Sequence, residues 1–138
     1  MGVSTIAARL GEIPIFTGCS KRDLSAIARV VREIDHETGS VIAVEGEPGA
    51  GLFVIDTGRA NVSIGGARVN TLGPGDFFGE MALLDGGPRT ATVTAATELQ
   101  LFALTGWAFR GLVSEHPQMA MRVMETMAAR LRAATEHD

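Results

Sequence analysis

The sequence predicts a mainly β fold of the α+β class, an antiparallel β-roll or jelly roll with helices at both ends of the chain. Short runs of strand-forming residues follow one another through the middle of the chain, separated by turns rich in Gly and Pro. Near the two ends, apolar residues instead recur at helical spacing. The chain has 138 residues, 46% of them hydrophobic, which is enough for one domain with a substantial core.

The N-terminal helices are expected within residues 1–31. Ser4–Leu10 can form one short helix. Further along, Ser20 with Asp23 three residues later has the pattern of an N-cap and an acidic first turn. The apolar residues after this cap fall at i, i+3, i+4 and i+7, and they are Leu24, Ile27, Ala28 and Val31. This spacing predicts an amphipathic helix.

The β-roll is expected over residues 32–104. The runs with strand character are Val41–Val44, Leu52–Ile55, Ala60–Ile64, Arg68–Leu72, Ala91–Ala95 and Leu99–Leu104. Turns that contain Gly separate them, as at Gly46–Gly49 and Gly73–Asp76. Several short strands at such close spacing favour an antiparallel sandwich or barrel over alternating βαβ units.

The C-terminal helices are expected over residues 105–138. Thr105 can cap a short helix that runs to Val113. Ser114, with Pro117 in the first turn, can open a longer helix that ends near Ala134. One apolar stripe on that longer helix contains Ala120, Val123, Met124, Met127 and Leu131. No repeat, linker or low-complexity segment divides the sequence, so residues 1–138 are expected to form a single domain.

Charge and cysteine content limit the possible partners and compartment. The formal net charge is −4, and a domain that binds nucleic acid through phosphates usually carries a basic face, so no nucleic-acid partner is expected. Cys19 is the single cysteine, so the chain has no internal disulfide and fits a reducing cytoplasm. There is no signal peptide pattern and no apolar run of about 18 residues, so no membrane partner is expected.

The sequence lacks the usual patterns of an enzyme. His36, His116 and His137 do not have the spacing of metal ligands, and no pattern supports a Ser-His-Asp hydrolase. We therefore expect no catalytic residues, no metal and no cofactor.

Residues 73–93, with the sequence GPGDFFGEMALLDGGPRTATV, carry the most chemical information. Gly79 lets the backbone approach a ligand closely, and the amides that open the short helical stretch after it can receive an anion. Arg89 offers a planar fork for two phosphate oxygens, and Thr90 adds a hydroxyl. Glu80 can accept a hydrogen bond from a sugar hydroxyl. Together these groups fit a ligand that has both a hydroxyl and a charged phosphate.

The motif FGEMALL followed by PRTATV resembles the phosphate-binding cassette of the cyclic nucleotide-binding domain family. That family includes protein kinase A regulatory subunits, cyclic nucleotide-gated channels and the bacterial catabolite activator. The resemblance covers essentially the whole chain, because the leading helices, EGEPGAGLFVIDTGRANV, LGPGDFFGE and the trailing helices occur in family order. It implies the β-roll fold and a regulatory, non-catalytic function.

The resemblance assigns roles to single residues. Glu80 would accept a hydrogen bond from the ribose 2′-hydroxyl, assisted by the Gly79 backbone. Ala82 would donate its backbone amide. Arg89 would pair with the exocyclic phosphate oxygens, and Thr90 would contribute its amide and hydroxyl.

Two further expectations concern the surroundings of this site. Met81 is expected to be one of the ligand-binding residues, and its side chain would pack inward under the site with those of Leu83 and Leu84. Many family members have Asp after the Gly of the EGEPG turn, where this chain has Ala50 and then Gly51. This departure affects the stability of the turn rather than the phosphate site.

In the family, the C-terminal helix closes over the base as a lid. An ungapped alignment from the cassette places Arg130 where a lid arginine stacks on the purine, whereas the alternative is a solvated arginine near a helix end. Thr90 makes cGMP acceptable, and cAMP is the expected physiological ligand.

The expected function is a regulatory domain or sensor that binds cAMP, with cGMP as an alternative ligand, and responds by moving its C-terminal helix. A downstream protein or a second copy of the chain is the expected partner. Because the given sequence stops at Asp138, directly after the last expected helix, no helix-turn-helix is expected within it. The alternative interpretation is the ligand-sensing piece of a larger catabolite-activator-type transcription factor, channel or enzyme.

Overall fold

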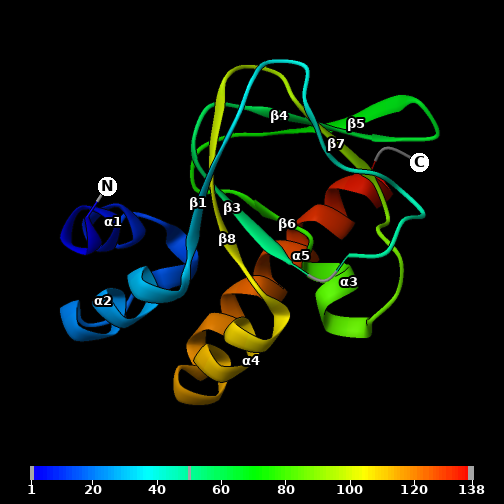
Figure 1. Ribbon diagram of the computed structural model, residues 1–138. Coiled ribbons are helices and arrows are strands. Elements are labelled where there is room, and N and C mark those ends of the chain that lie inside the picture. The colour runs from blue at the N-terminus through cyan, green and yellow to red at the C-terminus, as the bar shows by residue number, and fades with distance from the viewer. Residues whose placement is uncertain (1, 50, 137–138) are drawn as a thin grey trace.

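The computed structural model describes residues 2–49 and 51–136 (Figure 1). The helices are α1 (Val3–Leu10), a short 3-10 helix η1 (Pro14–Phe16), α2 (Lys21–Val30), α3 (Glu80–Asp85), α4 (Gly106–Glu115) and α5 (Pro117–Glu136). The strands are β1 (Arg32–His36), β2 (Val41–Ala43), β3 (Leu52–Thr57), β4 (Ala60–Ile64), β5 (Ala67–Leu72), β6 (Phe77–Phe78), β7 (Thr92–Ala95) and β8 (Leu99–Leu104).

The strands form two antiparallel four-stranded sheets, in the orders β1-β8-β3-β6 and β2-β7-β4-β5. In the first sheet, β8 pairs with β1 on one edge and with β3 on the other, so that Leu101 lies opposite both Ile34 and Ile55. In the second, Val62 of β4 lies opposite Val93 of β7. This arrangement confirms the predicted antiparallel β-roll with flanking helices.

The two central strands of the first sheet, β3 and β8, contribute side chains to two cores, one on each face. Leu52, Val54, Phe102 and Leu104 belong to a core shared with the helices. Their neighbours Ile55, Leu99 and Leu101 belong to a second core shared with the other sheet. Because side chains alternate along a strand, the first sheet lies between the helices and the second sheet.

The N-terminal helices are fastened to the roll by polar as well as apolar contacts. The Ser20 side chain accepts from the Asp23 backbone N–H at 3.1 Å, and the Asp23 carboxylate accepts from the Ser20 backbone N–H at 3.1 Å. This capping box confirms the predicted start of α2. Arg9 of α1 forms an ion pair with Asp56 of β3 and donates to Gln100 of β8 at 3.3 Å. The helices and the first sheet therefore form one packed body.

Two of the observed strands, β1 and β6, were not predicted from the sequence. β1 has the sequence REIDH, whose single apolar residue gives no clear alternation, and its backbone is held by pairing with β8. β6 is only two residues long and pairs Phe77 and Phe78 with β3. Both are formed by partners distant in the sequence.

The predicted start of the last helix was wrong. Thr105 caps α4 as expected, because its side chain accepts from the Ala108 N–H at 3.1 Å. Ser114, however, lies within α4, and its hydroxyl donates to the Arg110 carbonyl at 3.1 Å. α5 begins at Pro117, whose ring disfavours helical geometry at the preceding residue and so ends α4.

The predicted apolar stripe on α5 was wrong in part. Met119 and Val123 are buried and Met127 packs against them, whereas Met124 and Leu131 are 53% and 67% exposed. The contact line follows i, i+4 spacing from Met119, and Met124 lies about 100° away from Val123. None of the helices in the described part of the chain is long and apolar enough to cross a bilayer.

Candidate functional site

The turn between β5 and β6 sets the position of the cassette. The Asp76 carboxylate accepts from the Gly73 N–H at 2.8 Å, which closes the turn on itself. Ile55 of β3 then exchanges backbone hydrogen bonds with the turn, accepting from Gly75 and donating to Asp76, each at 2.8 Å. The chain therefore leaves the turn along β3 and reaches the start of α3 at a fixed place.

Gly79 stands at the N-terminus of α3 in a conformation that favours glycine. Its φ is +91°. A Cβ at this position would lie 2.4 Å from the Gly51 carbonyl oxygen and 2.6 Å from Arg89 Nη1. Glycine at this position therefore lets the Gly79 and Gly51 backbone segments and the Arg89 guanidinium meet. The predicted close approach of this backbone to a ligand stays a prediction.

Arg89 reaches across this meeting point. Its Nη1 donates to the Gly51 carbonyl at 3.1 Å and to the Gly79 carbonyl at 3.5 Å. Its guanidinium lies 5.5 Å from the centre of the Phe53 ring, which stacks in turn on Phe78. Partial burial lowers the pKa of Arg89, and the charge of Glu80 opposes that shift. Arginine remains protonated under such conditions, so the site keeps a positive charge.

The Gly-rich loop before β3 holds the other side of Arg89. The Arg89 N–H donates to the Glu47 carbonyl at 2.9 Å, and the Gly46 N–H donates to the Arg89 carbonyl at 2.8 Å. A Cβ on Gly49 would lie 2.6 Å from Arg89 Nε. A hollow of about 470 Å³ opens beside this contact, lined by Gly46, Pro48, Gly49, Gly86, Gly87 and Pro88.

Glu80 is the buried acid of the site, with 8% of its surface exposed. Its carboxylate forms an ion pair with Arg130 of α5, and Arg130 Nη1 donates to Glu80 Oε1 at 3.1 Å. Arg130 Nη2 donates to the Phe77 carbonyl at 2.6 Å, and the guanidinium lies 4.8 Å from the centre of the Phe77 ring. Residues 50 positions apart in the sequence are thus joined at the site.

The structure gathers most of the predicted site residues. Gly79, Glu80 and Arg89 lie around one point, and Arg130 reaches the same carboxylate from the C-terminal helix. Thr90 follows Arg89 and is exposed. Their roles toward a ligand stay predictions.

The expectation that three residues of α3 pack inward under the site was wrong for two of them. Leu83 is buried, as is Ala82 beside it, but Met81 and Leu84 are 42% and 53% exposed. A helix of six residues presents one face to the core, and residues three positions apart share the opposite face. The ligand-binding role expected for Met81 stays a prediction, and Ala50 lies outside the described residues.

The sequence analysis missed several residues that surround the site. The Gly51 carbonyl and the Phe53 ring hold Arg89, and Phe77 holds Arg130 through both its carbonyl and its ring. The Gly-rich turn before β3 gave a signal, since Gly49 lies close to the Arg89 side chain and the Gly51 carbonyl accepts from it. Phe77 gave none beyond its place in the cassette.

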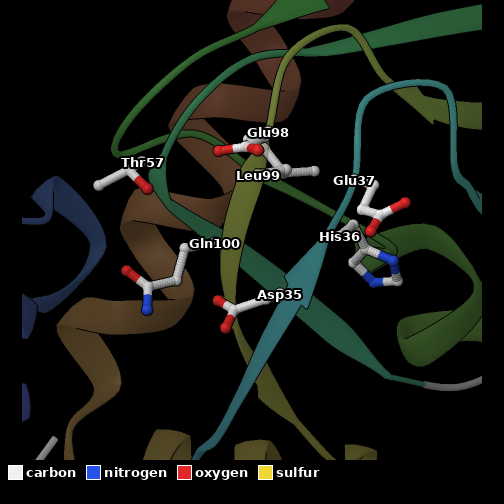
Figure 2. A pocket seen from close by; sticks show the side chains of 7 residues that line it. All are labelled: Asp35, His36, Glu37, Thr57, Glu98, Leu99 and Gln100. Carbon is white, nitrogen blue, oxygen red and sulfur yellow. The ribbon is translucent and has the colours of Figure 1, made fainter.

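A second hollow, of about 530 Å³, lies away from the cassette, where the end of β1 pairs with the start of β8 (Figure 2). Its lining is Asp35, His36, Glu37, Thr57, Glu98, Leu99 and Gln100. The carboxylates in Figure 2 do not converge on one point. Within residues 2–49 and 51–136, no group of three or more His, Cys, Asp or Glu side chains is placed to hold a metal ion.

The family model of the cyclic nucleotide-binding domain matches residues 33–116, more than half of the chain. The chain belongs to this family. The match spans the roll, the cassette and α4, which is where Gly79, Glu80 and Arg89 lie.

Similar members of the cyclic nucleotide-binding domain family occur in several kinds of protein. A CRP-like cAMP-activated global transcriptional regulator of Mycobacterium tuberculosis is 32% identical over 92% of this chain and 58% of its own length. A cyclic nucleotide-gated potassium channel of Rhizobium etli is 40% identical over 88% of this chain and 34% of its own length. This chain therefore spans less than two thirds of either relative.

Solved structures show the same fold. The structure of cAMP-bound PfPKA-R matches with a TM-score of 0.84 and 26% identity, over 96% of this chain and 47% of that one. The catabolite activator protein of Thermus thermophilus matches with a TM-score of 0.79 and 29% identity, over 90% of this chain and 61% of that one. In such relatives the domain is a regulatory module.

Proposed function

We propose that this domain is a non-catalytic sensor of cAMP, with cGMP as an alternative ligand. The observation that carries the proposal is the junction of Gly79, Glu80 and Arg89, where a partly buried guanidinium and a buried carboxylate meet at a glycine in the left-handed region. The names of the relatives support the choice of ligand, since one is described as cAMP-activated and one as cAMP-bound.

Each group has a role that its chemistry supports. Arg89 pairs with the exocyclic phosphate oxygens, and its guanidinium exchanges its weak carbonyl contacts for charge-assisted hydrogen bonds to the anion. Glu80 accepts from the ribose 2′-hydroxyl. The amides of Gly79 and Ala82 and the hydroxyl of Thr90 complete the cradle.

The response of the sensor involves α5, since Arg130 links that helix to Glu80. Ligand binding at the Glu80 carboxylate changes the position of α5. A downstream protein or a second copy of the chain recognises the new position. The single cysteine fits a reducing compartment, and we propose that the sensor acts in the cytoplasm.

A second candidate is the ligand-sensing piece of a longer regulator, channel or enzyme. The observation in its favour is the coverage of the curated relatives, of which this chain spans 58% and 34%. The site chemistry is the same in both cases, and only the element that reads α5 differs.

The binding test is isothermal titration calorimetry with cAMP, cGMP and the linear 5′-AMP. One site per chain is expected, with cAMP and cGMP preferred over the linear nucleotide. Arg89→Ala should weaken cAMP binding by about 2–5 kcal/mol, because the phosphate loses its charged partner. Arg68→Ala is the matched control, since Arg68 is exposed on β5 and its removal changes the net charge equally. The cAMP recovered after incubation with the protein should be chemically unchanged, because the proposed sensor is not catalytic.

The same titration tests the role of Glu80. 2′-deoxy-cAMP should bind more weakly than cAMP, because it lacks the hydroxyl that donates to the carboxylate. Equal binding of Arg89→Ala and Arg68→Ala would remove Arg89 from the site, and no binding of any cyclic nucleotide would refute the proposed function.

A further inference from the structure

The Arg89 guanidinium is held without an acidic partner. In the described part of the chain no ion pair includes Arg89, and the nearby carboxylate of Glu80 is paired with Arg130 instead. The Arg89 side chain donates to two neutral acceptors, the Gly51 carbonyl at 3.1 Å and the Gly79 carbonyl at 3.5 Å. Both bonds leave from Nη1, and the second lies at the limit of hydrogen-bond length. These two contacts leave most of the guanidinium unrestrained.

The Phe53 ring supplies a further contact. The guanidinium carbon of Arg89 lies over this ring, 5.5 Å from its centre. The ring in turn stacks on Phe78, with 5.1 Å between the two centres and 22° between the planes, and the same two residues are paired across β3 and β6. On its other edge β3 pairs with β8, where Phe53 lies opposite Ala103. The ring is therefore fixed by paired strands and a stacked neighbour, whereas arginine has much rotamer freedom of its own to lose.

An aromatic ring holds a guanidinium differently from a carboxylate. The ring attracts the cation through its quadrupole and carries no net charge. A carboxylate in the same place would neutralise the guanidinium and compete with an incoming anion for its N–H donors. Held by Phe53 and two carbonyls, Arg89 keeps its full positive charge, and its Nε and Nη2 groups make no hydrogen bond to the described residues. These donors can therefore bind phosphate oxygens.

Resting on the proposed function, we propose that Phe53 is a positioning residue of the nucleotide site, whose ring holds Arg89 ready for the cyclic phosphate. A side chain that is already ordered loses less conformational entropy when a ligand binds, so the affinity rises without a new contact to the ligand. Phe53 acts through Arg89 and contacts neither the ribose nor the base. Its contribution is the same for cAMP and cGMP, because the two nucleotides share the phosphate that Arg89 binds.

Titration calorimetry of Phe53→Leu and Phe53→Tyr tests this role. Leucine stays apolar but removes the ring, so cAMP binding should weaken about three- to tenfold. Tyrosine keeps the ring and should bind cAMP as wild type does. Phe109→Leu is the matched control for lost packing, because Phe109 is buried in the core shared with the helices, whereas Phe53 packs against the core between the sheets. Phe109→Leu should lose stability in thermal unfolding followed by circular dichroism and keep its cAMP affinity.

A double-mutant cycle shows whether the ring acts through Arg89. Phe53→Leu is combined with Arg89→Ala, and the weaker binding of cAMP by these variants is followed by NMR titration. Without the guanidinium the ring has nothing to position, so adding Phe53→Leu should change the affinity of Arg89→Ala by less than about twofold. A merely structural role of Phe53 would persist in the double variant.

NMR of the protein without nucleotide gives a second readout. The ring current of an aromatic side chain shifts the signals of nuclei that lie over its face. Phe53→Leu should therefore move the Arg89 Nε–H signal, whereas Phe109→Leu should leave it in place.

Three results would overturn the positioning role. Unchanged cAMP affinity of Phe53→Leu would show that binding does not need the ring. An equal loss in the wild-type and Arg89→Ala backgrounds would show that the ring acts on the fold or on the ligand directly. Unequal losses for cAMP and cGMP would place the ring against the base. Failure of the proposed function looks different, because wild type would then bind neither nucleotide while Phe53→Leu still moved the Arg89 Nε–H signal.

Discussion

Gly79→Ala tests the construction of the site at its tightest point. The backbone there has a φ of +91°, and an added Cβ would lie 2.4 Å from the Gly51 carbonyl oxygen. It would also lie 2.6 Å from Arg89 Nη1. Neither contact is tolerable without movement, and the carbonyl belongs to backbone that cannot swing away like a side-chain end.

The cost has two parts. Alanine in the left-handed region costs about 1–2 kcal/mol relative to its preferred conformation. Displacing packed backbone to make room for a methyl group costs about 1–3 kcal/mol. The free energy of unfolding should therefore fall by about 2–5 kcal/mol. Nucleotide affinity should fall about tenfold or more, because the same methyl group displaces the guanidinium that pairs with phosphate.

Two other glycines separate these contributions. Gly58 also has a φ of +91°, and its added Cβ would lie 2.2 Å from the Glu98 carbonyl oxygen, at a turn between β3 and β4 away from the cassette. Gly58→Ala should therefore lose comparable stability and keep nucleotide affinity. Gly86 has a φ of +70° and open space around it, so Gly86→Ala should lose only about 1–2 kcal/mol.

The assay is urea denaturation followed by circular dichroism, together with cAMP titration of the folded variants. If Gly79→Ala were no less stable than Gly86→Ala, the predicted steric clash between the added Cβ and the Gly51 carbonyl oxygen would be refuted. If Gly79→Ala and Gly58→Ala bound cAMP equally well, the link from Gly79 to Arg89 would be refuted.

Two further predictions concern the specificity of the site and the stability of α2. Thr90→Ala should lose more affinity for cGMP than for cAMP in calorimetry, because the hydroxyl can reach the guanine amino group of a syn base; equal losses would mean that the hydroxyl contacts only phosphate. Backbone and side-chain hydrogen bonds from Ser20 lower the pKa of Asp23. The stability that this provides is present above the unfolded pKa and is lost as pH falls through the folded pKa. Ser20→Ala keeps the backbone N–H that donates to Asp23 and removes only the side chain, so it should raise the Asp23 pKa part of the way in an NMR titration. An unchanged pKa would show that the Ser20 side chain does not contribute to the shift.

The sequence was informative where structure is decided locally. The side chains of Ser20 and Thr105 each bond to an amide three residues ahead, so a short pattern was enough to place both helix starts. The strand runs within 41–104 were predicted by apolar residues between Gly-containing turns. Gly79 and Arg89 were recognisable because the cassette is a continuous stretch of sequence.

The parts that could not be predicted depend on contacts between distant segments. β1 is fixed by its pairing with β8 rather than by its own residues. The ion pair between Glu80 and Arg130 joins positions 50 residues apart. The resemblance placed both residues at the ligand site, but it did not predict that they pair directly with each other. Met124 was assigned to the buried stripe because its spacing permits it, yet only the packing of α5 decides which of two adjacent apolar lines meets the core.

The burial of β8 on both faces bears on how this domain can unfold. Leu101 faces the core between the sheets and Phe102 faces the core beneath the helices, and neither side chain has any exposed surface. The two cores therefore share a strand, and neither can melt while the other stays intact. Such a shared element favours all-or-none cooperativity, in which partial opening is confined to segments outside the roll. Because the helices contribute side chains to the first of these cores, a substitution that loosens Leu10, Ile27 or Phe109 should lower the stability of the roll as well as that of its own helix.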